Sequence, residues 1–537
     1  MQLTYFINEC KKQTSKSNED ISLIFQNYNS QIIIKAIANK DLTLGNAKLN
    51  TRFKVNFQDL YFLNGYQSWT DSFEYSLRKR LRNIKKSPHI ITKKFAMDKY
   101  GDSSFYHYSI RKSHGYDIFY SKGSLESFIY NLNYEVAYLL IELIKDRRNL
   151  YLTSLLEGIS LHKGEEITLF NFKYFLTFKD GLENFQKDFP KLNTPKLFGY
   201  SSWYNYYQNI NEEIIYRDLE SIDPRFDLFQ IDDGYQNKVG DYLDINKEKF
   251  PNGLKPIVDK IHSKGLKAGI WLAPFVAESE SKLFAEHPEY FKLDIHGHPL
   301  KAGGNWSGFY SLDVQKEEVR NHIKKTLNHF MDLGFDFFKL DFLYACGLGQ
   351  FEGKSKCQVQ SEAYKFLREI LKDKIILGCG ANIINSYKNF DYLRVGPDVS
   401  LIFDDVGYMK LFHRERISTK VTIQNTIYRS LFNDHLFGND PDVFLLRDEN
   451  IGLLFEQRKA LTKINALFGS LLLTSDNLGT YHEKQKLVLE EAIDIFYHAS
   501  NVNFHKEGKK IRIAYSLHDK EHEFLYNTTK GVIENER

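Results

Sequence analysis

The chain has 537 residues, which is enough for two or three domains with at least one large core. Apolar residues make up 42% and charged residues 26%, as in an ordinary globular protein. The 72 Lys and Arg residues against 69 Asp and Glu leave a formal charge of +3, which gives no electrostatic basis for binding nucleic acid or an anionic membrane. No stretch approaches the ~20 apolar residues of a membrane span.

The N-terminal stretch MQLTYFINECKKQTSKSNED turns polar after a few residues and lacks the apolar core of a secretory signal. We therefore expect a cytoplasmic protein. The cysteines Cys10, Cys346, Cys357 and Cys379 are too few and too scattered for a disulfide framework. The CxxC and HExxH spacings of zinc sites are absent as well. The sequence gives no reason to expect a metal or another cofactor.

The first part of the chain, residues 1–180, carries short alternating runs such as SQIIIKAIA and NLYLTSLLEGISLH. Polar turns separate these runs, and long helical patterns are few. Alternation of apolar and polar residues is typical of half-buried antiparallel strands. We predict an N-terminal β-sandwich domain over residues 1–180.

From Leu197 to about Ser475 the pattern changes to strand, loop, helix and strand. FDLFQIDDGYQ, for example, precedes the helix-like GLKPIVDKIHSKG and then the apolar run LKAGIWLAPF. Repeated units of this kind predict a parallel sheet, and polar residues after the strands favour a closed (β/α)8 barrel over an open doubly wound sheet. We predict this barrel over residues 181–480. KIRIAYSLHDKEHEFLYN alternates again, which predicts a small β domain over residues 481–537.

Five of the predicted barrel strands end in polar side chains. Their sequences are SSWYNYY (201–207), QIDDGYQ (230–236), GIWLAP (269–274), FKLDF (338–342) and RVGPDV (394–399). The carboxyl ends of barrel strands meet at one mouth, so these side chains should converge there. Carboxylates, cations and flat aromatic faces together are what a sugar needs from its binding site.

Most of these residues, taken singly, also have a plain structural explanation. Acids beside glycine could be turn or cap residues, single tryptophans could pack in the core, and an arginine could form a surface ion pair. The residues concerned are Asp232, Asp233, Asp398, Trp203, Trp271 and Arg394.

Asp341 is harder to explain in this way, because it lies on the same face as Lys339 in the strongly apolar stretch FFKLDFL. A buried anion is costly unless it is paired or used. One alternative is therefore a structural ion pair between Lys339 and Asp341. The other is a catalytic carboxylate whose charged form the lysine favours.

Several motifs occur in a fixed order along the chain. They are NGYQSW (64–69), FGYSSWYNYYQNINEEII, the long block from Gln230 to Phe275, FFKLDFLYA, LGCGA, YLRVGPDV and FGNDPDVFLL. This series, from about residue 60 to 480, resembles the α-galactosidases of glycoside hydrolase family 36. The resemblance implies a multidomain α/β protein with an N-terminal β-sandwich, a (β/α)8 barrel and a small C-terminal β domain.

The resemblance also implies retaining hydrolysis of terminal α-linked galactose, as in melibiose or raffinose, without a cofactor or metal. It makes Asp341 the nucleophile and Asp398 the acid/base, and a retaining mechanism predicts ~5 to 5.5 Å between their carboxyls. The residues that it assigns to sugar binding are Asp232, Asp233, Lys339, Arg394, Trp203, Tyr204, Trp271, Cys379, Gly380 and Trp69.

Other functions stay open at this point. Asn382-Ile383-Ile384 follows LGCGA where the family usually has Pro-Leu, so an α-N-acetylgalactosaminidase is one alternative, and an α-galactosyl transglycosylase is another. A Schiff-base lyase would use Lys339 as its nucleophile. A metal-dependent barrel enzyme would use Asp232, Asp233 and Asp341 as oxygen ligands. An inactive sugar-binding protein and a homo-oligomer also stay open.

Overall fold

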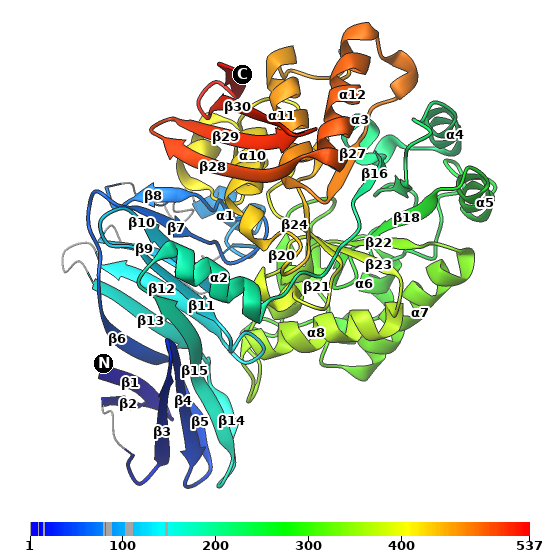
Figure 1. The fold of residues 1–537 in the computed structure, drawn as a ribbon. Helices are drawn as coiled ribbons and strands as arrows, with labels where there is room; N and C mark the ends of the chain where they lie inside the picture. The colour runs from blue at the N-terminus through cyan, green and yellow to red at the C-terminus, as the bar shows by residue number, and fades with distance from the viewer. Residues whose placement is uncertain are drawn as a thin grey trace.

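The structure is a computed structural model of the 537-residue chain. It describes all residues except 1, 9, 14–16, 79–80, 82–88, 102–110, 145–148 and 537. Figure 1 shows antiparallel sheets of the first third of the chain at the lower left, a parallel sheet with surrounding helices at the right, and a small C-terminal sheet at the top. In the described part of the chain, no helix is long and apolar enough to cross a membrane.

Two antiparallel sheets form the N-terminal part. The first has the strand order β14-β5-β1-β6-β13-β12-β9, with β2 paired to β1, and the second has the order β3-β4-β15-β11-β10-β7-β8. Their bounds are β1 Gln2–Ile7, β2 Cys10–Gln13, β3 Ile21–Tyr28, β4 Gln31–Ala38, β5 Leu42–Leu44, β6 Ala47–Lys54, β7 Leu60–Leu63, β8 Glu74–Ser76, β9 Lys112–Tyr116, β10 Ile118–Lys122, β11 Ser127–Asn131, β12 Tyr138–Ile144, β13 Asn149–Leu155, β14 Ile159–Leu161 and β15 Glu166–Phe175.

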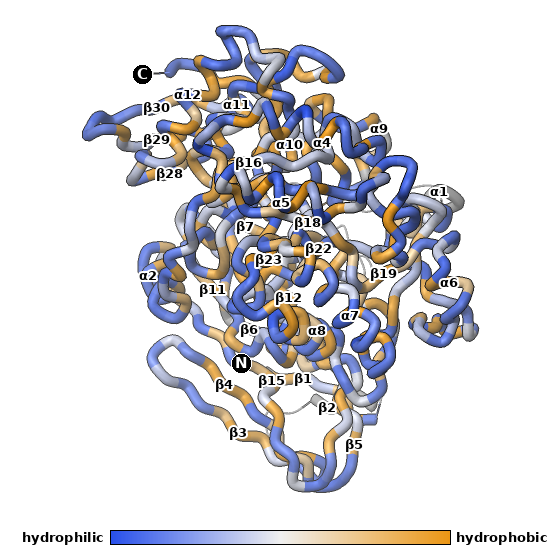
Figure 2. The backbone as a smooth tube through the Cα atoms, turned by 90° about the vertical axis from the view of Figure 1, so that its right-hand side faces the viewer, coloured by the Kyte–Doolittle hydropathy of each residue, from blue (hydrophilic) through white to orange (hydrophobic). Residues whose placement is uncertain are grey.

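The alternation in the sequence explains these strands. In β4, every second residue of QIIIKAIA is buried, so one face of the strand joins the core. Figure 2 shows the apolar stretches of β11 and β12 inside the molecule and a hydrophilic turn at the tip of the β3–β4 hairpin. The prediction of antiparallel N-terminal sheets is confirmed.

The parallel sheet closes into a barrel. Its strand order is β25-β24-β23-β22-β18-β17-β16-β27-β26, and β25 and β26 are two halves of one strand, interrupted at Pro441 and Asp442. β25 pairs with β24 and β26 with β27, so eight strand positions form a complete ring. The bounds are β16 Leu197–Ser201, β17 Leu228–Ile231, β18 Lys267–Leu272, β22 Phe337–Leu340, β23 Ile375–Gly378, β24 Tyr392–Arg394, β25 Gly438–Asp440, β26 Val443–Phe444 and β27 Leu471–Thr474.

Helices follow seven of the eight strand positions. They are α4 Glu212–Glu220, α5 Lys255–Ser263, α7 Glu317–Leu333, α8 Lys356–Leu371, α10 Thr419–Tyr428, α11 Phe455–Phe468 and α12 Glu483–His498. Further short helices are α1 His89–Lys94, α2 Phe178–Asp188, α3 Trp203–Tyr206, α6 Lys282–Glu286 and α9 Gly407–Phe412. The barrel prediction is confirmed, with one irregularity between β23 and β24.

That connection contains only the 3-10 helix η6, Ile384–Ser386. The N-terminal part of the chain covers this side of the barrel instead. Gln67 forms a β-bridge with Asn382, and the ring of Tyr387 lies 5.0 Å from that of Phe189 and 6.2 Å from that of Tyr134. One apolar core accordingly includes residues of both the N-terminal sheets and the barrel.

Local sequence signals determine where β22, the strand that precedes Asp341, begins. α7 buries Val319, Ile323 and Phe330 along one side, as its helical spacing requires. It ends at Gly334, whose φ of 103° is the left-handed conformation that glycine adopts without strain. The chain then turns directly into β22, which is fully buried.

Two smaller sheets complete the fold. β19 Val276–Glu278, β21 Phe309–Ser311 and β20 Lys301–Gly303 form a three-stranded sheet between β18 and α7. At the C-terminus, β28 Ser500–Glu507, β29 Lys510–Leu517, β30 Lys520–Asn527 and β31 Val532–Glu534 form a four-stranded antiparallel sheet. The domain boundaries at residues 180 and 480 stay predictions. We propose that the second lies after α12, because this helix follows the eighth strand and contacts α11.

Candidate active site

Asp341 follows β22 directly and lies at the carboxyl end of the barrel. Its Oδ1 accepts a hydrogen bond of 2.7 Å from the Phe342 backbone N–H, and its Oδ2 accepts one of 3.2 Å from Trp271 Nε1. Phe342 has a φ of 53°, a left-handed conformation that is unusual for an aromatic residue and that clusters at functional sites. Burial raises the pKa of Asp341 to about 6, although Lys339 lowers it, and the negative charge of Asp398 raises it further.

Lys339 is buried and donates to Asp232, with 2.8 Å between Nζ and Oδ2. The alternative in which Lys339 is the ion-pair partner of Asp341 is therefore wrong. Lys339 lowers the pKa of Asp341, as predicted, but burial raises that pKa by more. Burial on its own would lower the pKa of Lys339, whereas the Asp232 carboxylate raises it, and the net shift is upward.

Asp232 and Asp233 follow β17, and both are buried. Besides Lys339, Asp232 Oδ2 accepts 2.7 Å from Gln230 Nε2 and 3.4 Å from Ser201 Oγ. Asp232 Oδ1 accepts 2.9 Å from the backbone N–H of Asp233. These bonds fix the carboxylate within the barrel, so Asp232 is more than a turn residue.

Asp233 is held by three side-chain donors. Oδ1 accepts 2.6 Å from Gln236 Nε2, and Oδ2 accepts 2.9 Å from both Gln208 Nε2 and Trp306 Nε1. Burial raises the pKa of Asp233, and the hydrogen bonds partly offset that rise. The donors come from three separate loops, which together position one carboxylate.

Arg394, at the end of β24, is buried and contacts three carboxylates. Nη1 lies 2.9 Å from Asp398 Oδ1, Nε lies 2.7 Å from Asp440 Oδ2, and Nη2 lies 2.9 Å from Asp442 Oδ1. Tyr204 donates its hydroxyl hydrogen to Asp442. The role of Arg394 as a sugar ligand stays a prediction, and its bonds to carboxylates indicate that it positions them.

Three carboxylates around one guanidinium leave an excess of negative charge. Asp440 and Asp442 are fully buried, whereas the Asp398 side chain is 38% exposed. Burial raises the pKa of Asp442 to about 6, Arg394 lowers it, and the charges of Asp398 and Asp440 raise it. The excess negative charge thus favours the protonated form of Asp442.

Aromatic rings lie beside Asp341 and Asp233, whose carboxylates accept from Trp271 and Trp306. The Trp306 ring lies 6.1 Å from that of Trp271 and 5.3 Å from that of Phe342. Trp69 of the N-terminal part lies 5.5 Å from Phe342, and a Cβ at Gly380, whose φ is 65°, would lie 3.0 Å from its ring. Trp69, Trp306 and Phe342 are all partly exposed.

The remaining predicted residues lie in the same region. Trp203 is partly exposed on α3, with its ring 5.2 Å from that of Tyr207. Cys379, directly after β23, is buried, and burial raises the pKa of its thiol, while the neighbouring charges of Arg394 and Lys339 lower it. Apart from Trp203, whose ring contact is with Tyr207, the structure places the residues that the sequence assigned to one site close to one another, and their roles stay predictions.

Sequence reasoning missed several members of this group. Asp440 and Asp442 lie in FGNDPDVFLL, and a signal for them existed, because two acids interrupt an otherwise apolar run. Gln208 and Gln236 lie in quoted stretches but were not singled out, and Trp306 had no comparable signal. Gln208 lies in a 3-10 turn and the other two in loops, so no periodic pattern marks them.

Comparisons with known proteins agree with this geometry. Residues 176–368 match the Melibiase family model. Among curated proteins, the chain is 31% identical over 146 residues to Alpha-galactosidase Mel36A of Lactobacillus acidophilus, covering 26% of this chain and 19% of that one. It is 35% identical over 124 residues to an A type blood alpha-D-galactosamine galactosaminidase of Flavonifractor plautii, covering 21% of this chain and 11% of that one. The matched segments thus span less than a fifth of these curated relatives.

Solved structures share the fold over nearly the whole chain. The α-galactosidase TtGalA from Thermus thermophilus superposes with a TM-score of 0.72 at 22% identity, covering 93% of this chain and 98% of that one. The family 36 α-galactosidase AgaA from Geobacillus stearothermophilus gives a TM-score of 0.63 at 11% identity, covering 94% and 72%. The chain therefore shares the fold of these solved α-galactosidases, and its residues 176–368 are similar to the Melibiase family.

Proposed function

We propose that this chain is a retaining exo-α-galactosidase that removes terminal α-linked galactose from oligosaccharides. The observation that carries the proposal is the contrast between Asp341 and Asp398. Asp341 is held by N–H donors from Trp271 and Phe342, as an attacking carboxylate should be. Asp398 instead contacts the Arg394 guanidinium, and its side chain is 38% exposed, so a leaving group can reach it.

The proposed reaction has two displacements. In the first, Asp341 forms a bond to the anomeric carbon while the bond to the leaving oxygen breaks, and Asp398 gives its proton to that oxygen. In the second, Asp398 takes a proton from water, the water oxygen attacks the anomeric carbon, and Asp341 leaves as a carboxylate. Asp341 is mostly ionised at neutral pH, because its pKa is about 6.

Asp232 and Asp233 are proposed to accept hydrogen bonds from galactose hydroxyls, with the rings of Trp271, Trp306 and Trp69 against the C–H faces of the sugar. The related structures support this substrate class. TtGalA was solved with p-nitrophenyl α-D-galactopyranoside and with stachyose, and a variant of AgaA with raffinose.

The rival chemistries fit the site less well. A Schiff base needs a neutral amine, whereas Lys339 is ion-paired with Asp232 and its pKa is raised. A metal held by Asp232, Asp233 and Asp341 would compete with the N–H donors that already occupy their oxygens. Among described residues, these three acids do not form a group with converging ligand atoms.

The preference for galactose over N-acetylgalactosamine, which differ at carbon 2 of the sugar, can be tested directly. The relative from Flavonifractor plautii is named a galactosaminidase. In the present chain, however, the Asn382 side chain donates 2.8 Å to the backbone oxygen of Tyr66 and is buried, so it serves the contact with the N-terminal part. We expect aryl α-galactoside to be cleaved faster than aryl α-N-acetylgalactosaminide. Product analysis with sucrose as an acceptor distinguishes hydrolysis from transglycosylation.

Azide rescue tests the two catalytic roles. Asp341→Gly with an activated aryl α-galactoside and azide should form β-galactosyl azide, because azide replaces the missing nucleophile. Asp398→Gly should form the α-azide by way of the intact galactosyl-enzyme. Products of the opposite configuration would mean that the roles are exchanged. Activity of both variants without azide would overturn the proposal.

A further inference from the structure

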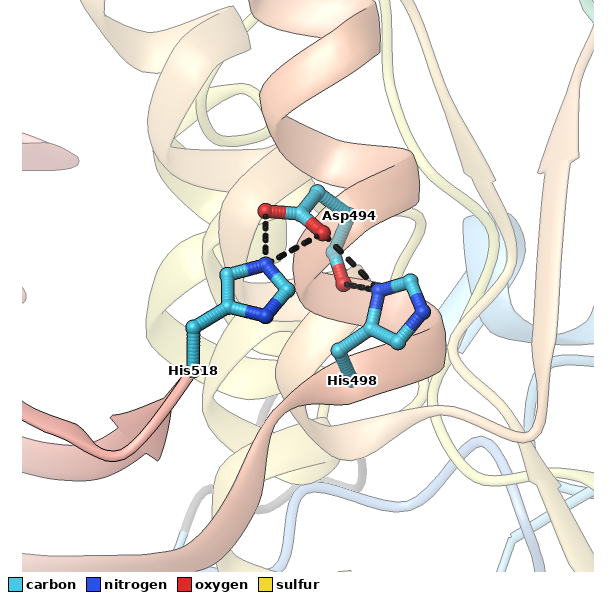
Figure 3. Close-up of side chains that lie close together, drawn as sticks. All are labelled: Asp494, His498 and His518. Carbon is cyan, nitrogen blue, oxygen red and sulfur yellow. Dashed lines mark hydrogen bonds and ion pairs between the residues drawn. The ribbon is translucent and has the colours of Figure 1, made fainter.

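Two histidines and an aspartate lie close together on the surface. Along the chain, they come after the strands that carry the candidate active site. Asp494 and His498 lie one turn apart on α12, and His518 lies in the turn between β29 and β30 (Figure 3). Neither the proposed reaction nor the packing of the core uses these side chains. Their exposed fractions are 40%, 58% and 59%, so an ion from solvent can reach all three.

The potential ligand atoms point toward one another. His498 Nδ1 lies 2.8 Å from Asp494 Oδ1, and His518 Nε2 lies 2.9 Å from both Asp494 oxygens. All three residues offer ligand atoms within 4.8 Å of one another. Ligands about 2.0–2.2 Å from one zinc ion lie a little over 3 Å apart, so only small side-chain shifts are needed to admit the ion.

The backbone around the cluster also suits a cation. α12 ends at His498, and the carbonyl groups at a helix C-terminus carry partial negative charge. His518 and Asp519 have φ values of 49° and 61°, in a two-residue turn where glycine or asparagine is usual. A histidine at this position is better explained by its ring, which contacts Asp494, than by a backbone preference.

We propose that Asp494, His498 and His518 bind a Zn²⁺ ion. Two imidazole nitrogens and one carboxylate oxygen are ligands that zinc takes readily, whereas Mg²⁺ and Ca²⁺ prefer oxygen. The ion replaces the hydrogens that now link the rings to the carboxylate, and water completes its coordination. Protons that these nitrogens carry are released on binding.

The ion would join two parts of the fold. α12 lies against the barrel helix α11, and His518 belongs to the C-terminal sheet. A zinc ion shared by them would fix that sheet to the barrel and would stabilise the folded chain, because it binds the folded state alone. The spacing of the three residues matches no common zinc motif, so this site could not be predicted from motifs in the sequence.

Isothermal titration of Zn²⁺ into the chelator-treated, tag-free full chain tests the proposal. We expect one ion per chain, with Kd raised about tenfold or more in His518→Gln and in His498→Gln. His505→Gln is the matched control, because His505 is exposed on β28 of the same sheet and lies outside the cluster. This variant should bind like the wild type, and Mg²⁺ should not compete.

Thermal unfolding provides a second measurement that does not depend on enzymatic activity. At one fixed zinc concentration, Zn²⁺ should raise Tm of the wild type and of His505→Gln by equal amounts and that of His518→Gln by less. Absence of micromolar zinc binding by the wild type would overturn the proposal. The same Kd in His518→Gln and His505→Gln would do so too, since binding would then occur elsewhere on the surface.

Discussion

Lys339 donates to Asp232 across the barrel, with Nζ 2.8 Å from Oδ2, although Asp341 follows it on the same face of the chain. The pair joins β22 to the end of β17 across the intervening strand β18. Lys339 thus compensates one buried acid and acts on Asp341 only from a distance. Burial raises the pKa of Asp341 to about 6. A carboxylate with this pKa can act as the proposed nucleophile and later as the leaving group.

Removal of the Lys339 charge should destabilise the protein strongly. Lys339→Met leaves Asp232 buried without its cation, and we expect the free energy of unfolding to fall by about 3–5 kcal/mol. Urea unfolding at neutral pH measures the change. The double variant Lys339→Met/Asp232→Asn has no uncompensated charge and should recover part of the loss. Additive losses would show that the two side chains are not coupled.

At acid pH, the decrease of kcat/KM should reflect the protonation of Asp341. Burial raises its pKa to about 6, so the attacking carboxylate becomes protonated, and kcat/KM falls, as pH decreases through 6. Trp271→Phe removes an N–H donor that lowers this pKa, so the acid limb should shift to higher pH. Trp306→Phe is the matched control, because its N–H donates to Asp233 and the limb should not move. A limb that moves equally in both variants would contradict the assignment.

Sequence patterns were sufficient to predict the fold class and the convergence of polar residues at the strand ends. Alternation in QIIIKAIA gave the antiparallel strands, and polar residues after apolar runs placed Asp232, Asp341 and Arg394 at one end of a barrel. Such patterns depend only on residues that are neighbours along the chain. Because the strands of a barrel are parallel, their carboxyl ends then meet at one mouth.

The partners of these side chains could not be predicted in the same way. Lys339 bonds to a residue two strands away, and the choice between Asp232 and Asp341 depends on distances across the barrel. The missing helix between β23 and β24 has a similar cause, since Gln67 and Tyr134 of the N-terminal part occupy that side. Both features arise from tertiary contacts that no local pattern records.

At basic pH, the decrease of kcat/KM should depend on the carboxylates that contact Arg394. Asp442→Asn removes one negative charge, and the amide can still accept from the backbone N–H of Val399, which lies 2.8 Å from Asp442 Oδ2. With one negative charge removed beside Arg394, the basic limb of kcat/KM should shift to lower pH. Circular dichroism checks the fold. A basic limb at the wild-type position would show that Asp442 does not influence the acid.

Trp306 should contribute to sugar binding through Asp233. Trp306→Phe preserves a ring beside Trp271 but removes the 2.9 Å hydrogen bond to the carboxylate. We expect kcat/KM for an aryl α-galactoside to fall by about 5- to 150-fold, which corresponds to roughly 1–3 kcal/mol. Tyr310→Phe, on β21 after the loop that carries Trp306, also removes one polar group and should have little effect. Equal losses in the two variants would attribute the effect to the sheet as a whole and would exclude a specific role for the Trp306–Asp233 bond.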